Sequence, residues 1–133
     1  VEKLTRQVCM EDDVYFLGKQ EAVEELLAIA DLFVLPSETE SFGLAALEAM
    51  ACEVPVISTN TGGIPEINVQ GVTGYLSNVG DVDDMAANAI KILSDESTLL
   101  QFRKNAIAQA NKFSLDSILP MYEAYYRKVI EQK

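Results

Sequence analysis

Histidine is absent from this sequence of 133 residues, and positively charged residues are scarce. Ten lysines and arginines stand against 21 aspartates and glutamates, so the formal net charge at pH 7 is −11. Without histidine, the chain lacks the most common general base and the most common nitrogen ligand of metal ions. Nucleic acids and anionic membrane surfaces are recognised through clusters of basic residues, so the charge balance argues against both as partners.

Cysteine is also rare, and long apolar runs are missing. Cys9 and Cys52 show neither the spacing of a metal site nor the framework of a secreted disulfide protein. We interpret them as reduced thiols of a cytoplasmic protein, with Cys52 as a small core residue. No stretch approaches the roughly 18 apolar residues that a membrane-spanning helix needs, and the start lacks the pattern of a signal peptide.

The rest of the composition is that of an ordinary globular domain. Hydrophobic residues make up 49% of the chain and charged residues 23%. A chain of this length forms one domain that buries about two thirds of the surface its unfolded state would expose. The sequence has no internal repeat and no low-complexity tract. It opens on Val1 rather than on methionine, so we expect residues 1–133 to be part of a longer protein.

The clearest pattern lies between residues 32 and 58. Residues 32–35 are an apolar run without polar alternation, which predicts a buried strand, and a polar loop follows at 36–41. Residues 42–52 have the pattern of a helix, and residues 55–58 read as a second strand. This order predicts a βαβ crossover.

The segments around this unit continue the same alternation. Residues 1–10 have helical spacing of apolar side chains, residues 14–17 read as a short strand, and residues 21–30 predict an amphipathic helix. Alternating strands and helices predict a parallel sheet with right-handed crossovers, and such sheets bind ligands beyond the carboxyl ends of their strands. Residues 74–76 are expected to add one more strand.

From Asp81 onward the sequence predicts helices. Acidic residues at 81–84 mark the start of the first one, and either Ser94 or Asp95 is expected to cap the second. The side chains of the first helix that we expect to face the core are Met85, Ala89, Ile92 and Leu93.

Ser114 and Ser117 are expected to open the last helix. Three tyrosines follow, and they resemble a surface on which nucleic-acid bases could stack. We interpret them as packing residues, because no basic residues alternate with them along a groove. These residues are Tyr122, Tyr125 and Tyr126.

Two acids flank the start of the central helix. Glu40 stands just before it and Glu48 inside it, so at a rise of about 1.5 Å per residue they cannot both contact one atom. They can hold the two ends of an extended polar ligand. Between them lie the free backbone N–H groups near Phe42, Gly43 and Leu44, which favour an anion, and glycine allows close approach to the main chain. A sugar joined to a diphosphate matches this arrangement.

Paired carboxylates also suggest the hydrolysis of a glycosidic bond, with one acid as proton donor and the other as nucleophile. That chemistry requires both carboxyl groups to converge on one bond, which the spacing of Glu40 and Glu48 does not guarantee. Both interpretations stay open on the residues alone.

The run Glu-Ser-Phe-Gly-Leu…Leu-Glu-Ala-Met-Ala-Cys at 40–52 resembles the donor-binding core of the retaining family 4 glycosyltransferases of GT-B fold. The similarity spans residues 14–126. Residues 16–20 and 62–66 look most like those members that join N-acetylglucosamine, taken from its uridine diphosphate donor, to L-malate in bacillithiol synthesis. The resemblance implies an α/β fold with a Rossmann-like parallel sheet and a helical C-terminal tail, in a donor domain whose first strand–helix units and N-terminal acceptor domain lie outside this sequence.

The resemblance also implies roles for individual residues. Glu40 would be the catalytic carboxylate that contacts the transferred sugar, and Glu48 would hold the ribose hydroxyls. In the family the loop after residues 14–17 lies against the nucleotide base; without the resemblance, that loop would be read as a plain turn. The anomeric configuration is retained and no metal is obligatory, so neither a metal site nor a cofactor is expected. The donor-binding residues would be Gly18, Lys19, Gln20, Ser41, Phe42, Gly43, Leu44, Glu48, Gly62 and Gly63.

Two departures from the family pattern have consequences. Glu53 stands where the family has a glycine at the end of the helix, so we expect local strain there. The arginine and lysine that clamp the diphosphate in the family would precede Val1, and Lys19 is the only base near the expected pocket. We therefore expect this chain alone to be inactive.

The partners implied are a UDP-sugar and the N-terminal GT-B domain. The competing class of function is a binding or assembly module that keeps the Rossmann-like scaffold without catalysis. In that case the chain could form a homo-oligomer through faces that its partner domain would otherwise cover.

Overall fold

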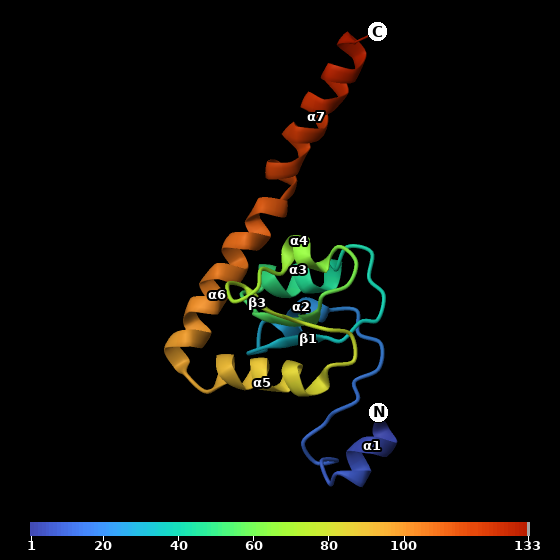
Figure 1. Ribbon diagram of the computed structural model, residues 1–133, viewed down its shortest axis with the longest axis vertical. Helices are drawn as coiled ribbons and strands as arrows, with labels where there is room; N and C mark the ends of the chain where they lie inside the picture. Colours follow the sequence, from blue (N-terminus) through green and yellow to red (C-terminus); the bar gives the residue numbers. More distant parts are fainter. Residues whose placement is uncertain (133) are drawn as a thin grey trace.

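A parallel sheet lies at the centre of the computed structural model, which describes residues 1–132 (Figure 1). Its strands are β1 (Phe33–Leu35), β2 (Val56–Thr59) and β3 (Gly74–Ser77), in the order β1-β2-β3. Every residue of the middle strand β2 is buried, whereas Val34 of the outer strand β1 is 50% exposed. The predicted crossover from residue 32 to residue 58 and the additional strand near 74–76 are both confirmed. The expectation that the strand at 32–35 is buried is wrong, because β1 is an outer strand and none of its residues is buried.

Helices cover both faces of this sheet. In Figure 1, α3 (Leu44–Ala51) and α4 (Ile64–Ile67) lie on one side, and α5 (Val82–Leu93) lies on the other. Helix α6 (Glu96–Ala110) packs against both α3 and α5 and so joins the two layers at one end of the sheet. The shorter elements are α1 (Glu2–Gln7), α2 (Val23–Leu27) and the 3₁₀ turn η1 (Asn111–Phe113).

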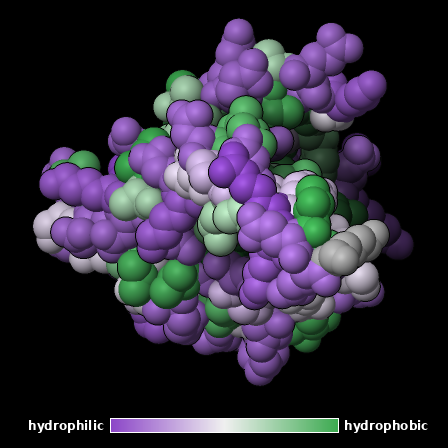
Figure 2. Space-filling view, turned by 90° about the horizontal axis from the view of Figure 1, so that it is seen from above, coloured by the Kyte–Doolittle hydropathy of each residue, from purple (hydrophilic) through white to green (hydrophobic). Residues whose placement is uncertain are grey.

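Helix α7 (Leu115–Glu131) extends away from the body of the molecule (Figure 1). None of these residues is buried, and Tyr125, for example, is 64% exposed. Figure 2 looks onto the end toward which α7 points and shows green apolar side chains between purple hydrophilic ones. The helix itself was expected, but within the described residues its tyrosines do not pack into a core.

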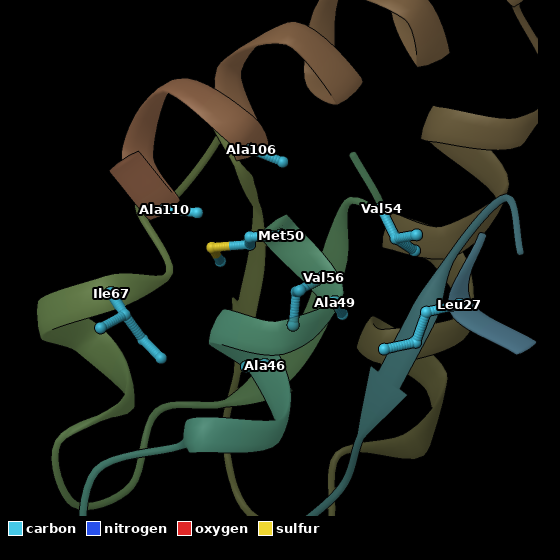
Figure 3. Packing of buried hydrophobic residues seen from close by; sticks show 9 residues of the cluster. All are labelled: Leu27, Ala46, Ala49, Met50, Val54, Val56, Ile67, Ala106 and Ala110. Atoms are coloured by element: carbon cyan, nitrogen blue, oxygen red, sulfur yellow. The ribbon is translucent and has the colours of Figure 1, made fainter. Parts of the chain in front are cut away.

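The larger of two core clusters lies between α3, β2 and α6 (Figure 3). Met50 is fully buried there, and it lies beside the alanines Ala106 and Ala110 of α6 (Figure 3). Small side chains on both helices bring their backbones close together, so a single long side chain fills the remaining space. A second cluster on the opposite face of the sheet contains Ile57, Met85, Ile92 and Phe102.

Side-chain caps begin the three helices that follow the sheet. Asp81 accepts a hydrogen bond from the amide of Asp84, and Asp95 accepts one from the amide of Thr98. These bonds satisfy N–H groups that have no partner inside the helix. The helix start predicted at 81–84 is confirmed, and of the two candidates Ser94 and Asp95 it is Asp95 that caps α6. The predicted start at Ser114 is also confirmed, since its hydroxyl accepts a hydrogen bond from the Ser117 amide.

Three further sequence predictions are wrong. Residues 14–17 are not a strand, and Tyr15 is 81% exposed, because an apolar run becomes a strand only where a neighbouring strand pairs with its backbone. The helix expected at 21–30 is shorter, since α2 spans Val23–Leu27. Leu93, expected in the core, is 49% exposed at the last turn of α5.

None of the helices in the described part combines the length and the apolar character that crossing a bilayer requires.

Glu53 adopts a left-handed backbone conformation with φ of +62°, in the turn that follows α3. Because this conformation costs a residue with a Cβ atom about 1–2 kcal/mol, we expect Glu53→Gly to raise the free energy of unfolding by about 1 kcal/mol. Denaturant unfolding measures the change. Glu53→Ala is the control: it removes the charge but keeps the Cβ atom, so a gain as large as that of glycine would show that strain is not the cause.

The cap of α6 predicts a pH dependence. Hydrogen bonds from the side chains of Ser97 and Thr98 and from the Thr98 amide lower the pKa of Asp95 below its ordinary value of 3.8. The charged carboxylate therefore stabilises the fold above pH 3.8, and this contribution is lost as the pH falls through the lowered pKa of the folded state. Asp95→Asn should reduce the free energy of unfolding at neutral pH, and the difference from the wild type should vanish in acid. A difference that stays constant with pH would contradict this assignment.

Candidate functional site

Two loops meet at the carboxyl edge of the sheet, the place where ligands bind in folds of this kind. One follows β1 and the other follows β2. Thr59 Oγ1 donates a hydrogen bond to the carbonyl of Ser37 at 2.6 Å, and the amide of Gly63 donates to the carbonyl of Ser41 at 3.1 Å. These bonds tie the two loops into one wall.

The glycines of the second loop make this contact possible. A Cβ atom on Gly62 would lie 1.5 Å from the carbonyl oxygen of Glu40, and one on Gly63 would lie 2.6 Å from that of Ser41. Gly62 also has a φ of +57°, in the left-handed region. The structure therefore brings Gly62 and Gly63 against the backbone of Glu40 and Ser41.

Helix α3 begins at this wall without a side-chain cap. Its N-cap residue is Gly43, which has a left-handed φ of +93°. Within the helix, the amide of Leu47 donates to the carbonyl of Gly43, so the amides of the preceding residues 44–46 have no partner inside the helix. By contrast, the long helices α5, α6 and α7 all begin with a capping side chain. Ala46 is fully buried, so the open N–H donors at the start of α3, which carry partial positive charge, are those of the exposed residues Leu44 and Ala45.

Glu40 is half-buried beside this helix start. Its Oε1 accepts a hydrogen bond from the amide of Ser41 at 3.1 Å, and its Cγ lies 3.9 Å from the place where a Cβ atom of Gly43 would be. Among the described residues, no lysine or arginine forms an ion pair with Glu40 or with Glu48. The Glu40 carboxylate is thus held next to the open amides without being neutralised by a neighbour.

Glu48 is exposed on α3 and faces a hollow of ≈ 390 Å³ between α2 and α3. Glu21 and Glu24 line the same hollow, together with Cys52. Neither of these two acids was predicted as a site residue. Their places on the polar face of an amphipathic segment indicated exposure, but helical spacing cannot show that this face turns toward Glu48.

The loop that contains Gly18, Lys19 and Gln20 lies apart from the Glu40 wall along the chain and is exposed. Its Gln20 side chain donates a hydrogen bond to the carbonyl of Leu17, which closes the loop on itself. The loop leads directly into Glu21, which lines the hollow that Glu48 faces.

Phe42 and Leu44 point to a different surface. They line an apolar hollow of ≈ 610 Å³ together with Phe113 and the side chains of α7, and the rings of Phe42 and Phe113 meet edge to face with centroids 5.9 Å apart. These two residues can therefore contribute backbone amides to the helix start while their side chains face α7. No group of three or more carboxylates or cysteines among residues 1–132 is arranged to hold a metal ion.

Comparison with known proteins places these features in a family. Residues 1–109 match the family model described as glycosyl transferases group 1. Over 129 residues, the chain is 46% identical to N-acetyl-alpha-D-glucosaminyl L-malate synthase of Bacillus anthracis, an alignment that covers 96% of this chain and 34% of that protein. D-inositol 3-phosphate glycosyltransferase of Mycolicibacterium smegmatis is 34% identical over 126 residues, which cover 90% of this chain and 29% of that protein. The chain thus spans about a third of the length of these relatives.

Solved structures share the fold. Alr3699/HepE of Anabaena, crystallised with UDP, superposes with a TM-score of 0.89 at 27% identity, over 96% of this chain and 35% of that one. Sucrose-phosphate synthase of Thermosynechococcus elongatus superposes with a TM-score of 0.87 at 29% identity, over 99% of this chain and 34% of that one. These neighbours have the Rossmann-like donor-domain architecture of GT-B enzymes, which confirms the expected fold class. Because the family model matches most of this chain, the chain belongs to the group 1 glycosyltransferases.

Proposed function

We propose that this chain is the donor-binding part of a retaining glycosyltransferase and that it holds a UDP-sugar across the start of α3. The observation that carries the proposal is the uncapped helix start at Gly43, which lies at the carboxyl edge of the sheet between two unpaired carboxylates. Crystals of the similar Anabaena protein contain UDP in one case and UDP-glucose in another. A nucleotide-sugar carries an anionic centre with hydroxyl groups at both ends, which matches this order of groups.

Each end of the site suits one part of such a donor. Glu40, held by the Ser41 amide, would accept hydrogen bonds from hydroxyls of the transferred sugar. The amides at the start of α3 would face the diphosphate. Glu48 would accept hydrogen bonds from the ribose, and the loop Gly18–Gln20 would lie near the base, because it leads into the hollow that Glu48 faces.

The 46% identity to the N-acetyl-alpha-D-glucosaminyl L-malate synthase of Bacillus anthracis supports a more specific proposal for the whole protein. It would transfer N-acetylglucosamine from its UDP donor to L-malate in the cytoplasm. Both cysteines are free thiols, which agrees with that compartment. Lys19 is the only one of the proposed donor-binding residues with a cationic side chain. We therefore propose that the cations that stabilise the leaving diphosphate come from outside this chain and that the chain alone is inactive.

Hydrolysis of a glycosidic bond suits the geometry less well, because it needs two carboxyl groups that converge on one bond. Glu40 is held against the loop amide of Ser41, whereas Glu48 faces the hollow between α2 and α3. One observation favours a non-catalytic assembly module instead: helix α7 has no buried residue. Calorimetry with UDP separates this module from the donor site.

Calorimetry with UDP tests the donor site in this chain. We expect weak binding in the millimolar range, and Glu48→Ala should weaken it by roughly tenfold or more, because hydrogen bonds to a charged group contribute about 1.5–3 kcal/mol. Glu96→Ala, which removes an exposed acid from the first turn of α6, is the matched control and should leave the affinity unchanged. Absence of UDP binding to the wild type at millimolar concentration would favour the assembly module.

Steady-state kinetics of the whole enzyme test the role of Glu40. Glu40→Gln keeps the size of the side chain but removes its charge, so we expect kcat/KM to fall by roughly a hundredfold, the scale on which a single preorganised polar group acts. Glu38→Gln changes an exposed acid of the same loop and should retain nearly full activity. Near-normal turnover of the Glu40 variant would refute its catalytic role.

A further inference from the structure

Helix α4 forms an apolar support behind the left-handed turn at Gly43. Ile64 and Ile67 of this helix are fully buried. A Cβ atom built on Gly43 would lie 3.1 Å from Ile67 Cδ1 and 3.2 Å from Ile64 Cγ1, both closer than ordinary contact. The two isoleucines therefore fill the space on that side of the turn, and the backbone at Gly43 cannot move toward α4 without displacing them.

A helix as short as α4 cannot hold its own position, since one turn of helix is unstable without outside contacts. Its first residues are fixed by the wall described above, through the bond between the Gly63 amide and the Ser41 carbonyl. Its C-cap residue is Asn68, whose backbone N–H donates a hydrogen bond to the carbonyl of Ile64 at 2.9 Å. The position of the helix thus depends on what holds Asn68.

The side chain of Asn68 is fully buried and bonded to the sheet. The two N–H groups of its Nδ2 are shared among three acceptors, the carbonyl of Val56 at 3.1 Å, Ser58 Oγ at 2.7 Å and the carbonyl of Tyr75 at 3.2 Å. Its Oδ1 accepts a hydrogen bond from Thr73 Oγ1 at 2.9 Å. These partners belong to β2, to β3 and to the turn before β3. The end of α4 is therefore fixed to the centre of the sheet.

The neighbouring strand leaves room for this side chain. Gly74 begins β3, and a Cβ atom there would lie 2.9 Å from Asn68 Oδ1 and 1.7 Å from the carbonyl oxygen of Val56. An aliphatic side chain in place of Asn68 could not satisfy the carbonyl and hydroxyl groups that its amide now bonds, and leaving buried polar groups unsatisfied is costly. The position of Asn68 therefore requires a side chain that can both donate and accept hydrogen bonds.

We infer that Asn68 is a positioning residue for donor binding: through α4 it holds Ile64 and Ile67 against Gly43 and so fixes the direction of the open amides of α3. The inference rests on the proposed function, in which those amides face the diphosphate. Donors that are already aligned need no reorganisation when an anion arrives, and small displacements of such groups reduce affinity. Asn68 itself would not touch the ligand.

A pair of conservative variants tests this chain of contacts. Ile67→Val removes Cδ1, the atom nearest to the Gly43 turn, and Ile92→Val makes the same change at a fully buried site on the opposite face of the sheet. We expect Ile67→Val to shift the backbone amide signals of Gly43 and Leu44 in ¹⁵N NMR spectra of the ligand-free chain, and to weaken UDP binding by about threefold to tenfold. Ile92→Val, matched for the loss of one buried methyl group, should do neither.

A second pair addresses Asn68 directly. Asn68→Ala and Asn88→Ala each remove a buried amide, but Asn88 bonds Ser77 and Asp84 on the α5 side of the sheet. Only the Asn68 variant should move the Gly43 and Leu44 signals; if it does not fold, the isoleucine pair decides. Unchanged signals in Ile67→Val, or equal changes in Ile67→Val and Ile92→Val, would overturn the inference. If the wild type binds no UDP, the proposed function fails, while the amide signals still test whether α4 positions the turn.

Discussion

The close contact between the backbone of residues 62–63 and that of residues 40–41 is the constraint on which the rest of the site depends. No side chain fits between these two loops, because the carbonyl oxygens of Glu40 and Ser41 occupy the space of a Cβ atom. This contact places Glu40 beside the start of α3 and lets α4 reach the far side of Gly43. A carboxylate and a set of open amides therefore become neighbours without any direct bond between them.

Charge makes this arrangement selective. The chain carries a net charge of −11, so the electrostatic potential summed over the whole chain repels a nucleotide diphosphate. The partial positive charge of the α3 start is short in range and acts only within its first turn. Anion binding by this chain thus requires that the amides be open and correctly aligned, and an uncapped helix supported from behind by two buried isoleucines meets both conditions. In the proposed donor site, the carboxylates of Glu40 and Glu48 would favour hydroxyl-bearing groups over further phosphates.

Local patterns predicted much of this structure. The apolar run before Pro36 and the helical spacing after Phe42 were sufficient for the central crossover, and the caps at Asp81, Asp95 and Ser114 follow from side-chain chemistry within four residues. Glu53 was expected to be strained, and its positive φ shows that it occupies a left-handed turn.

What could not be predicted depends on residues distant in sequence. The run at 14–17 has the composition of a strand, but strand formation requires a neighbouring backbone, which composition does not reveal. Asn68 looks like an ordinary turn residue in the sequence, and its bonds to both β2 and β3 become visible only once the sheet has formed. The same holds for Glu21 and Glu24, which line one hollow with Glu48 only because α2 packs against α3.

The most direct test of the donor site is a crystal structure of this chain soaked or grown with UDP. The account predicts that the diphosphate oxygens accept hydrogen bonds from the amides at the start of α3 and that the ribose hydroxyls donate to the Glu48 carboxylate. UDP bound elsewhere on the chain, or bound with the start of α3 empty, would contradict it.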